Sequence, residues 1–130
     1  MSTEKRLENE ECGQQILEDR EEKERKICIL HAVWFKKPAG SKLYNEYLLL
    51  VNPIAVNHGA YKVVGLIPRE ILRGGFRPDY ISVVEWPSMC HYYQFLKDPL
   101  YHRISTMRDE AIEKAIVIDC SRVSWFYMKQ

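Results

Sequence analysis

The chain has 130 residues, of which 46% are hydrophobic and 28% charged, and its formal net charge is +1. This length indicates one domain with one core, and the hydrophobic share argues against a disordered chain. No stretch approaches the roughly 18 apolar residues that cross a bilayer, so a membrane span is excluded. The small net charge gives no overall reason to expect a nucleic-acid partner.

The first 26 residues differ in composition from the rest of the chain. They hold nine acidic and six basic side chains, and no aromatic residue occurs before Trp34. We expect residues 1–26 to be a charged extension that is either helical, through pairs of Glu with Lys or Arg, or solvated. The folded domain is predicted to span residues 27–126.

The first half of this domain is predicted to run strand, helix, strand. Residues 27–35 are rich in β-forming residues and alternate two sets of side chains. Ser41 is the predicted N-cap of the following helix, and Pro53 is expected to bend that helix or to begin a second short turn. Gly59 is the predicted stop, and residues 61–67 form the second strand.

The second half is predicted to run strand, helix, strand. Residues 79–86 form the third strand, and Ser88 is a predicted N-cap. Asp98-Pro99 is a second helix start, which predicts a helix over residues 99–114 and a last strand over 115–123. The resulting order, βαββαβ, is that of an α+β, ferredoxin-like domain with a four-stranded antiparallel sheet.

The strand patterns also predict a partner. The first and third strands are apolar in both alternating sets, whereas a sheet with one solvated face alternates apolar and polar residues. Two helices cover only one face, so we expect a second copy of the chain to cover the other. The alternative, that residues 1–26 fold over this face, is weakened by their few apolar side chains.

The cysteines and histidines give no sign of a metal or cofactor. Cys12, Cys28, Cys90 and Cys120 are widely separated, without a C-x-x-C pair or the spacing of a zinc site. No phosphate-binding or dinucleotide glycine motif is present. The N-terminus lacks the apolar stretch of a secretory signal, so we expect reduced thiols in a cytoplasmic protein.

One set of motifs resembles a known family. Val84-Glu85-Trp86-Pro87-Ser88, then Lys97-Asp98-Pro99-Leu100-Tyr101 and Arg108, resemble in order and spacing the family named domain of unknown function 1330. The resemblance covers roughly residues 27–121 and implies a dimeric α/β barrel, in which two sheets face each other with the helices outside. Tyr92 stands where that family has a small residue, which predicts a narrower pocket beneath the second helix.

Two residues are candidates for proton transfer. His31 lies in an otherwise apolar strand and belongs to the residue type that titrates near neutrality. The alternative is that His31 is a core or interface histidine whose ring is satisfied by a backbone carbonyl. Glu85 lies near the end of the third strand and would act as a base if desolvation raised its pKa. The alternative role for Glu85 is a structural ion pair with Arg108.

Three further residues are candidates for ligand binding. Tyr47, Tyr101 and Arg108 would hold an oxygen-bearing molecule between helices and sheet, although buried tyrosines also serve as core residues. The leading functional hypothesis is a dimeric α/β-barrel protein that binds a small, partly apolar molecule. The resemblance implies a cofactor-independent isomerase or oxygenase as its enzymatic version. The alternative is a non-catalytic assembly or regulatory module, and the aromatic pattern of RNA-binding sheets is absent.

Overall fold

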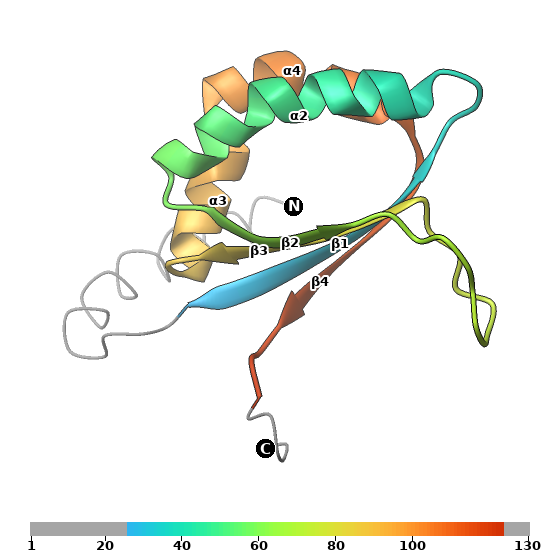
Figure 1. The fold of residues 1–130 in the computed structure, drawn as a ribbon. Helices are drawn as coiled ribbons and strands as arrows, with labels where there is room; N and C mark the ends of the chain where they lie inside the picture. The colour runs from blue at the N-terminus through green and yellow to red at the C-terminus, as the bar shows by residue number, and fades with distance from the viewer. Residues whose placement is uncertain (1–25, 124–130) are drawn as a thin grey trace, which may run out of the picture.

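The computed structural model of the protein describes residues 26–123 (Figure 1). The predicted charged extension, apart from Lys26, and residues 124–126 of the predicted domain lie outside this range. The elements follow in the order β1 (Ile27–Phe35), α2 (Gly40–Asn57), β2 (Tyr61–Leu66), β3 (Tyr80–Trp86), α3 (Met89–Lys97), α4 (Pro99–Ala111) and β4 (Ile112–Cys120).

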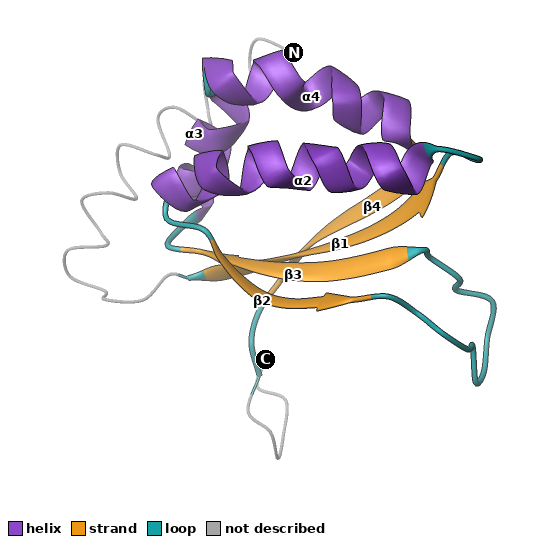
Figure 2. Cartoon of the chain, turned by 45° about the horizontal axis from the view of Figure 1, so that its top comes forward, coloured by secondary structure: helices purple, strands orange, loops and turns teal. Residues whose placement is uncertain are grey.

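The strands form one four-stranded sheet in the order β2-β3-β1-β4, and all three pairings are antiparallel. Helices α2, α3 and α4 all lie on one face of this sheet (Figures 1 and 2). The predicted α+β class and strand topology are therefore confirmed, with the second helical region divided into α3 and α4. No helix within residues 26–123 combines the length and the apolarity that a membrane crossing requires.

The division between α3 and α4 follows from two side-chain caps. The Ser88 hydroxyl accepts a hydrogen bond from the His91 amide at 3.3 Å, and a carboxylate oxygen of Asp98 accepts one from the Leu100 amide at 2.8 Å. Pro99 occupies the first turn of α4, where its missing N–H costs nothing. Both predicted helix starts are confirmed.

Helix α2 differs from the prediction at its start and in its middle. It begins at Gly40 rather than after a Ser41 cap, and no side chain caps it. A Cβ at Gly40 would lie 2.5 Å from the Ala111 carbonyl oxygen, so glycine lets α2 approach the end of α4. The helix continues as one element through the exposed Pro53, so the predicted second turn is absent. Gly59 ends it as predicted, with φ of 91°.

The last strand begins three residues earlier than predicted. Helix α4 ends at Ala111, and β4 starts at Ile112, which is paired with Phe35 beyond an irregularity in the register. Ile112 is 9% exposed and belongs to the core. A buried β-branched residue of this kind favours the strand, and this tertiary contact outweighs the helical pattern of the preceding residues.

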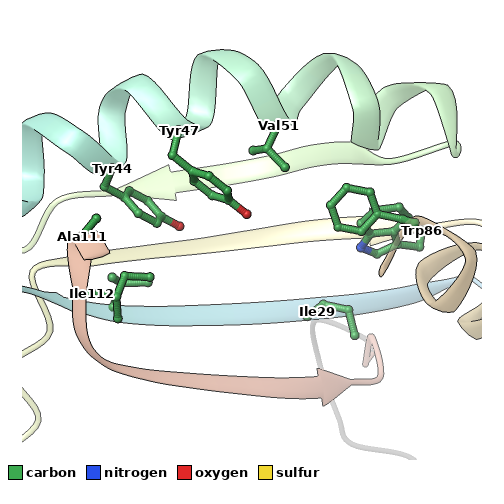
Figure 3. Close-up of a cluster of buried hydrophobic side chains, with 9 residues drawn as sticks. Ile29, Tyr44, Tyr47, Val51, Trp86, Ala111 and Ile112 are labelled. Atoms are coloured by element: carbon green, nitrogen blue, oxygen red, sulfur yellow. The ribbon is translucent and has the colours of Figure 1, made fainter. Parts of the chain in front are cut away.

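Alternation along the strands gives the sheet two different faces. On the covered face, below the helices, Ile29 and Val33 of β1 belong to a buried cluster that is completed mainly by the helices and Trp86 (Figure 3). The register places the other side chains of each strand on the opposite surface, which we call the bare face. Its apolar residues are Leu30, Trp34, Val64, Leu66, Ile81, Val83, Ile116 and Ile118.

Candidate functional site

A cavity of about 440 Å³ lies between the helices and the covered face. Binding sites for small molecules usually occupy roughly 300–1,000 Å³ and combine apolar walls with a few polar groups. This cavity has that character. Its apolar lining includes Val51, Ala55, Val84, Trp86, Phe95 and Leu96, and its polar lining includes His31, Tyr44, Tyr47, Lys62, Ser82, Tyr92, Tyr101 and Arg108.

The sheet supplies the polar floor of the cavity. His31 on β1 lies directly opposite Ser82 on β3 and Val117 on β4. Directly opposed residues of antiparallel strands point to the same face, which explains why all three line the cavity. Lys62 reaches it from β2, and its ammonium group donates a hydrogen bond to the Tyr80 hydroxyl at 3.1 Å.

Tyrosines from α2 and α4 form the opposite wall. Tyr44 and Tyr47 lie about one turn apart on α2, with ring centroids separated by 5.5 Å, and the Tyr101 ring packs 4.6 Å from that of Phe95. Burial raises the pKa of Tyr44 to about 12. Burial and then the neighbouring Tyr101 raise the pKa of Tyr47 far above its ordinary value. These hydroxyls therefore remain protonated at neutral pH and serve as hydrogen-bond donors.

His31 is neutral at physiological pH. Burial, followed by the positive charges of Arg108 and Lys62, lowers its pKa from 6.5 to about 4. A neutral imidazole carries one donor and one acceptor nitrogen, so His31 can accept a hydrogen bond from a bound molecule, and a bound negative charge would favour its protonation. The two cations that lower its pKa both line the same cavity.

The charge of the cavity has one sign. Arg108 and Lys62 contribute positive charge, and none of the described residues that line the cavity is acidic. The Arg108 guanidinium lies 3.9 Å from the carboxylate of Asp109, whose side chain is 76% exposed. At that distance and exposure the pair is weak, so it leaves the cavity electropositive.

Trp86 contributes a buried donor without an acceptor. The residue is 3% exposed, and its indole Nε1 has no hydrogen-bond partner in the described part of the chain. Figure 3 shows this nitrogen on the side of the indole nearer to Tyr47. A buried, unpaired N–H costs free energy, and such groups are rare in native structures unless a bound molecule satisfies them.

The structure separates the two candidates for proton transfer. His31 lines the cavity, whereas the register pairs Glu85 with Cys28 and Tyr61 on the bare face. The predicted alternative of a Glu85–Arg108 ion pair is wrong. The Glu85 carboxylate instead lies 2.7 Å from Arg122 and 3.8 Å from Lys26, because Arg108 is on the other side of the sheet.

The three predicted ligand-binding residues line this cavity together, and the structure adds others that the sequence did not single out. Tyr47, Tyr101 and Arg108 all contribute to the wall. Trp86 and Lys62 were missed as site residues, although both follow from the alternation of their strands once the covered face is known. Tyr92 forms part of the wall, and the cavity remains open to a ligand in its presence.

Metal-ligating side chains are not concentrated here. Within residues 26–123, no group of three or more His, Cys, Asp or Glu side chains comes together as a metal site. His31 is therefore not part of a ligand set among these residues. The chemistry that this site supports is hydrogen bonding, charge compensation and transfer of a proton.

Solved structures with the same fold are distant in sequence. A protein of unknown function from Rhodopseudomonas palustris has 21% identity and a TM-score of 0.70, over 76% of this chain and 83% of its own. A dimeric ferredoxin-like protein of unknown function from Jannaschia has 12% identity and a TM-score of 0.64, over 75% and 99%. A Bacteroides thetaiotaomicron protein classed with the antibiotic biosynthesis monooxygenases has 15% identity and a TM-score of 0.56, over 80% and 96%.

At these identities the solved structures establish the ferredoxin-like fold and nothing finer. No curated protein matches the sequence. The model of one protein family, described as a domain of unknown function (DUF1330), matches residues 29–119. That match covers all three helices, β2 and β3, all but the outer ends of β1 and β4, and every residue named above as cavity lining. The chain therefore belongs to the DUF1330 family.

Proposed function

We propose that this domain binds a small, partly apolar, oxygen-bearing molecule in the cavity between the helices and the covered face. The observation that carries the proposal is the convergence of polar donors from α2 and α4 on one apolar cavity. Arg108, Tyr47 and Tyr101 reach the same cavity, and the buried Trp86 N–H in its wall lacks an acceptor. A ligand oxygen would satisfy these donors, and the apolar walls would desolvate the rest of the molecule.

As an enzyme, the domain would be a cofactor-independent isomerase. His31 would accept a proton from a carbon next to a carbonyl group and return it to another carbon of the same molecule. The tyrosine hydroxyls would stabilise the negative oxygen that forms between the two transfers, and Arg108 would hold the substrate in place. The protonated imidazole would then be balanced by the negative charge of the bound intermediate.

The oxygenase alternative would begin with the same step. Removal of a proton by His31 would create an electron-rich carbon, which would then react with molecular oxygen as the second substrate. Support for this alternative comes from the fold shared with the Bacteroides chain, which is classed with monooxygenases. Because one fold hosts many reactions, this support is weaker than that from the site itself.

A test of the site combines ligand screening with variants on both faces. Thermal-shift and calorimetric screening of small carbonyl compounds should find molecules that stabilise the wild-type chain. Ala55→Phe, which fills the cavity, should abolish this stabilisation, and Leu49→Phe, on the exposed side of the same helix, should retain it. His31→Ala should alter binding, whereas Glu85→Gln on the bare face should not. Stabilisation that survives Ala55→Phe would reject the cavity as the site.

We also propose that the chain forms a homodimer through the bare face. Two of the apolar side chains on this face, Leu66 and Ile118, are 52% and 46% exposed in one copy. Contiguous apolar surface of this kind marks an interaction site, and a self-complementary surface is the common solution. The dimeric Jannaschia protein shares the fold. Sedimentation equilibrium should give twice the mass of one chain, and a stable monomer would favour the alternative of a module that assembles with other proteins.

We place the protein in the cytoplasm. Within the described residues, Cys28 and Cys120 form no disulfide. Unpaired cysteines are typical of reducing compartments, where disulfides do not persist. Fractionation of cells that produce the full chain tests this location.

A further inference from the structure

We propose that the ligand of the cavity is an organic monocarboxylate with a flat, apolar body, and that Arg108 binds its carboxylate. This inference rests on the proposed function and makes it more specific.

The sign of the charge follows from the lining of the cavity. Arg108 and Lys62 are its charged residues among those described, and no acidic side chain balances them there. A partly buried cation without a close counterion is unfavourable, and a bound anion would correct the imbalance. Guanidinium presents two parallel N–H donors that match the two oxygens of a carboxylate, which favours this anion over a point-like one.

The number of charges follows from the different positions of the two cations. The Arg108 side chain is 27% exposed, and its neighbour Asp109 lies too far away for a close pair. Lys62 is exposed and already donates to the Tyr80 hydroxyl. Arg108 is therefore the more buried cation of the cavity, and Lys62 is the more exposed one. We infer that the ligand carries a single negative charge, which binds at Arg108, and that Lys62 attracts the anion toward the opening.

The shape follows from the aromatic side of the cavity. The Trp86 ring packs against Tyr92 and Phe95, with centroid separations of 5.3 and 5.0 Å, and Val51 and Ala55 complete this wall. An apolar cavity of roughly 150 Å³ holds one benzene molecule. The cavity of about 440 Å³ therefore has room for a ring with a short side chain.

Calorimetry with matched pairs of compounds tests the charge directly. The probes are cinnamate with cinnamamide, and 2-naphthoate with 2-naphthamide, so that each pair differs in charge but hardly in shape. Wild-type protein should bind each carboxylate about 10- to 100-fold more tightly than its amide. Equal affinities within both pairs would overturn the proposal.

Variants of one helix locate the charged contact. Arg108→Gln should reduce carboxylate affinity to that of the amide, and Arg108→Lys should retain part of it, since an ammonium keeps the charge but loses the paired donors. Arg103→Gln, on the exposed side of α4, should bind as the wild type does. Carboxylate binding that is unchanged in a folded Arg108→Gln or Arg108→Lys variant would contradict the assignment.

A second measurement distinguishes a failure of this inference from a failure of the proposed function. If amides and carboxylates bind equally and Ala55→Phe abolishes both, the cavity is the site but the anion is wrong. If no probe binds and Ala55→Phe leaves thermal stabilisation by every screened compound intact, the site itself is wrong. Nuclear magnetic resonance of His31 adds an independent signal, because a bound carboxylate should raise its pKa and a bound amide should not.

Discussion

The two faces of the sheet are built from the same four strands, yet they present different kinds of surface. The covered face borders a cavity between strands and helices, whereas none of the helices within residues 26–123 lies on the bare face (Figure 1). A concave surface can enclose a small molecule, whereas an open apolar sheet can pack face to face against a second sheet. If both proposals hold, one set of strands serves two kinds of recognition.

The polar groups divide in the same way. On the bare face, the Glu85 carboxylate is balanced by Arg122 and Lys26. On the covered face, Arg108 has no close acidic partner in the cavity, and the Trp86 N–H has no acceptor among the described residues. Incomplete pairing is therefore concentrated where we propose that the ligand binds.

The largest expected difference between the faces concerns their two tryptophans. Trp86→Ala should lower the free energy of unfolding by about 3–5 kcal/mol, because it removes a large buried side chain from the core. Trp34→Ala on the bare face should cost less than half as much, since Trp34 is only partly buried. Urea unfolding at low protein concentration, followed by circular dichroism, measures both. Equal costs would contradict the division into a core face and an open face.

The next effect concerns the pH dependence of the covered face. The pKa of His31 falls from 6.5 to about 4 on folding, so the unfolded chain binds the proton more readily between these values. Stability should be complete above about pH 6.5 and should fall by up to about 3 kcal/mol as the pH decreases toward 4. Urea unfolding across this range should show the loss in wild type and in the exposed control His102→Gln. His31→Gln should lack it, and a loss that persists there would assign the effect to another group.

A smaller effect is expected from a charge on the bare face. Ile118→Lys places an ammonium group at the proposed dimer interface and should weaken dimerisation about 100-fold, because the charge must be desolvated without a partner. Leu49→Lys on the exposed surface of α2 should leave dimerisation unchanged. Sedimentation velocity over a range of concentrations gives both constants. Unchanged association of the Ile118 variant would exclude this face.

The smallest effect concerns the cap of α3. Ser88→Ala removes the hydroxyl that accepts from the His91 amide and should cost about 1 kcal/mol of unfolding free energy. Ser105→Ala, within α4, should change it by less than about 0.5 kcal/mol. Dimerisation should be the same in both variants, because α3 lies on the covered face. A change in dimerisation with Ser88→Ala would show that the two faces are coupled.

Local signals explain how much of the fold the sequence could predict. Ser88, Asp98 and Pro99 mark helix starts through their own hydrogen bonds or ring geometry, so both starts were predicted correctly. The start of α2 at Gly40 depends on its close approach to Ala111, and the start of β4 at Ile112 depends on its pairing with Phe35. Both contacts join residues that are far apart in the sequence and meet only in the folded chain. Those boundaries were missed.

The site was predictable only in part, for the same reason. Tyr47, Tyr101 and Arg108 were identified from their pattern, and all three line the cavity. The partner of Glu85 depends on which face its strand turns outward, and that follows from the register between β3 and β1. Without this register, Arg108 was a plausible partner for Glu85, whereas the folded chain pairs Glu85 with Arg122.

Neighbouring positions of β1 contribute to both surfaces, because His31 lines the cavity and Leu30 lies on the bare face. Inserting one residue into this strand would exchange the two sets of side chains beyond the insertion. Ligand choice and self-association can therefore diverge through substitutions in β1, but hardly through changes in its length. Among relatives, insertions and deletions should instead gather in the segment 67–75 between β2 and β3, which precedes the contact of Phe76 with Trp34 on the bare face.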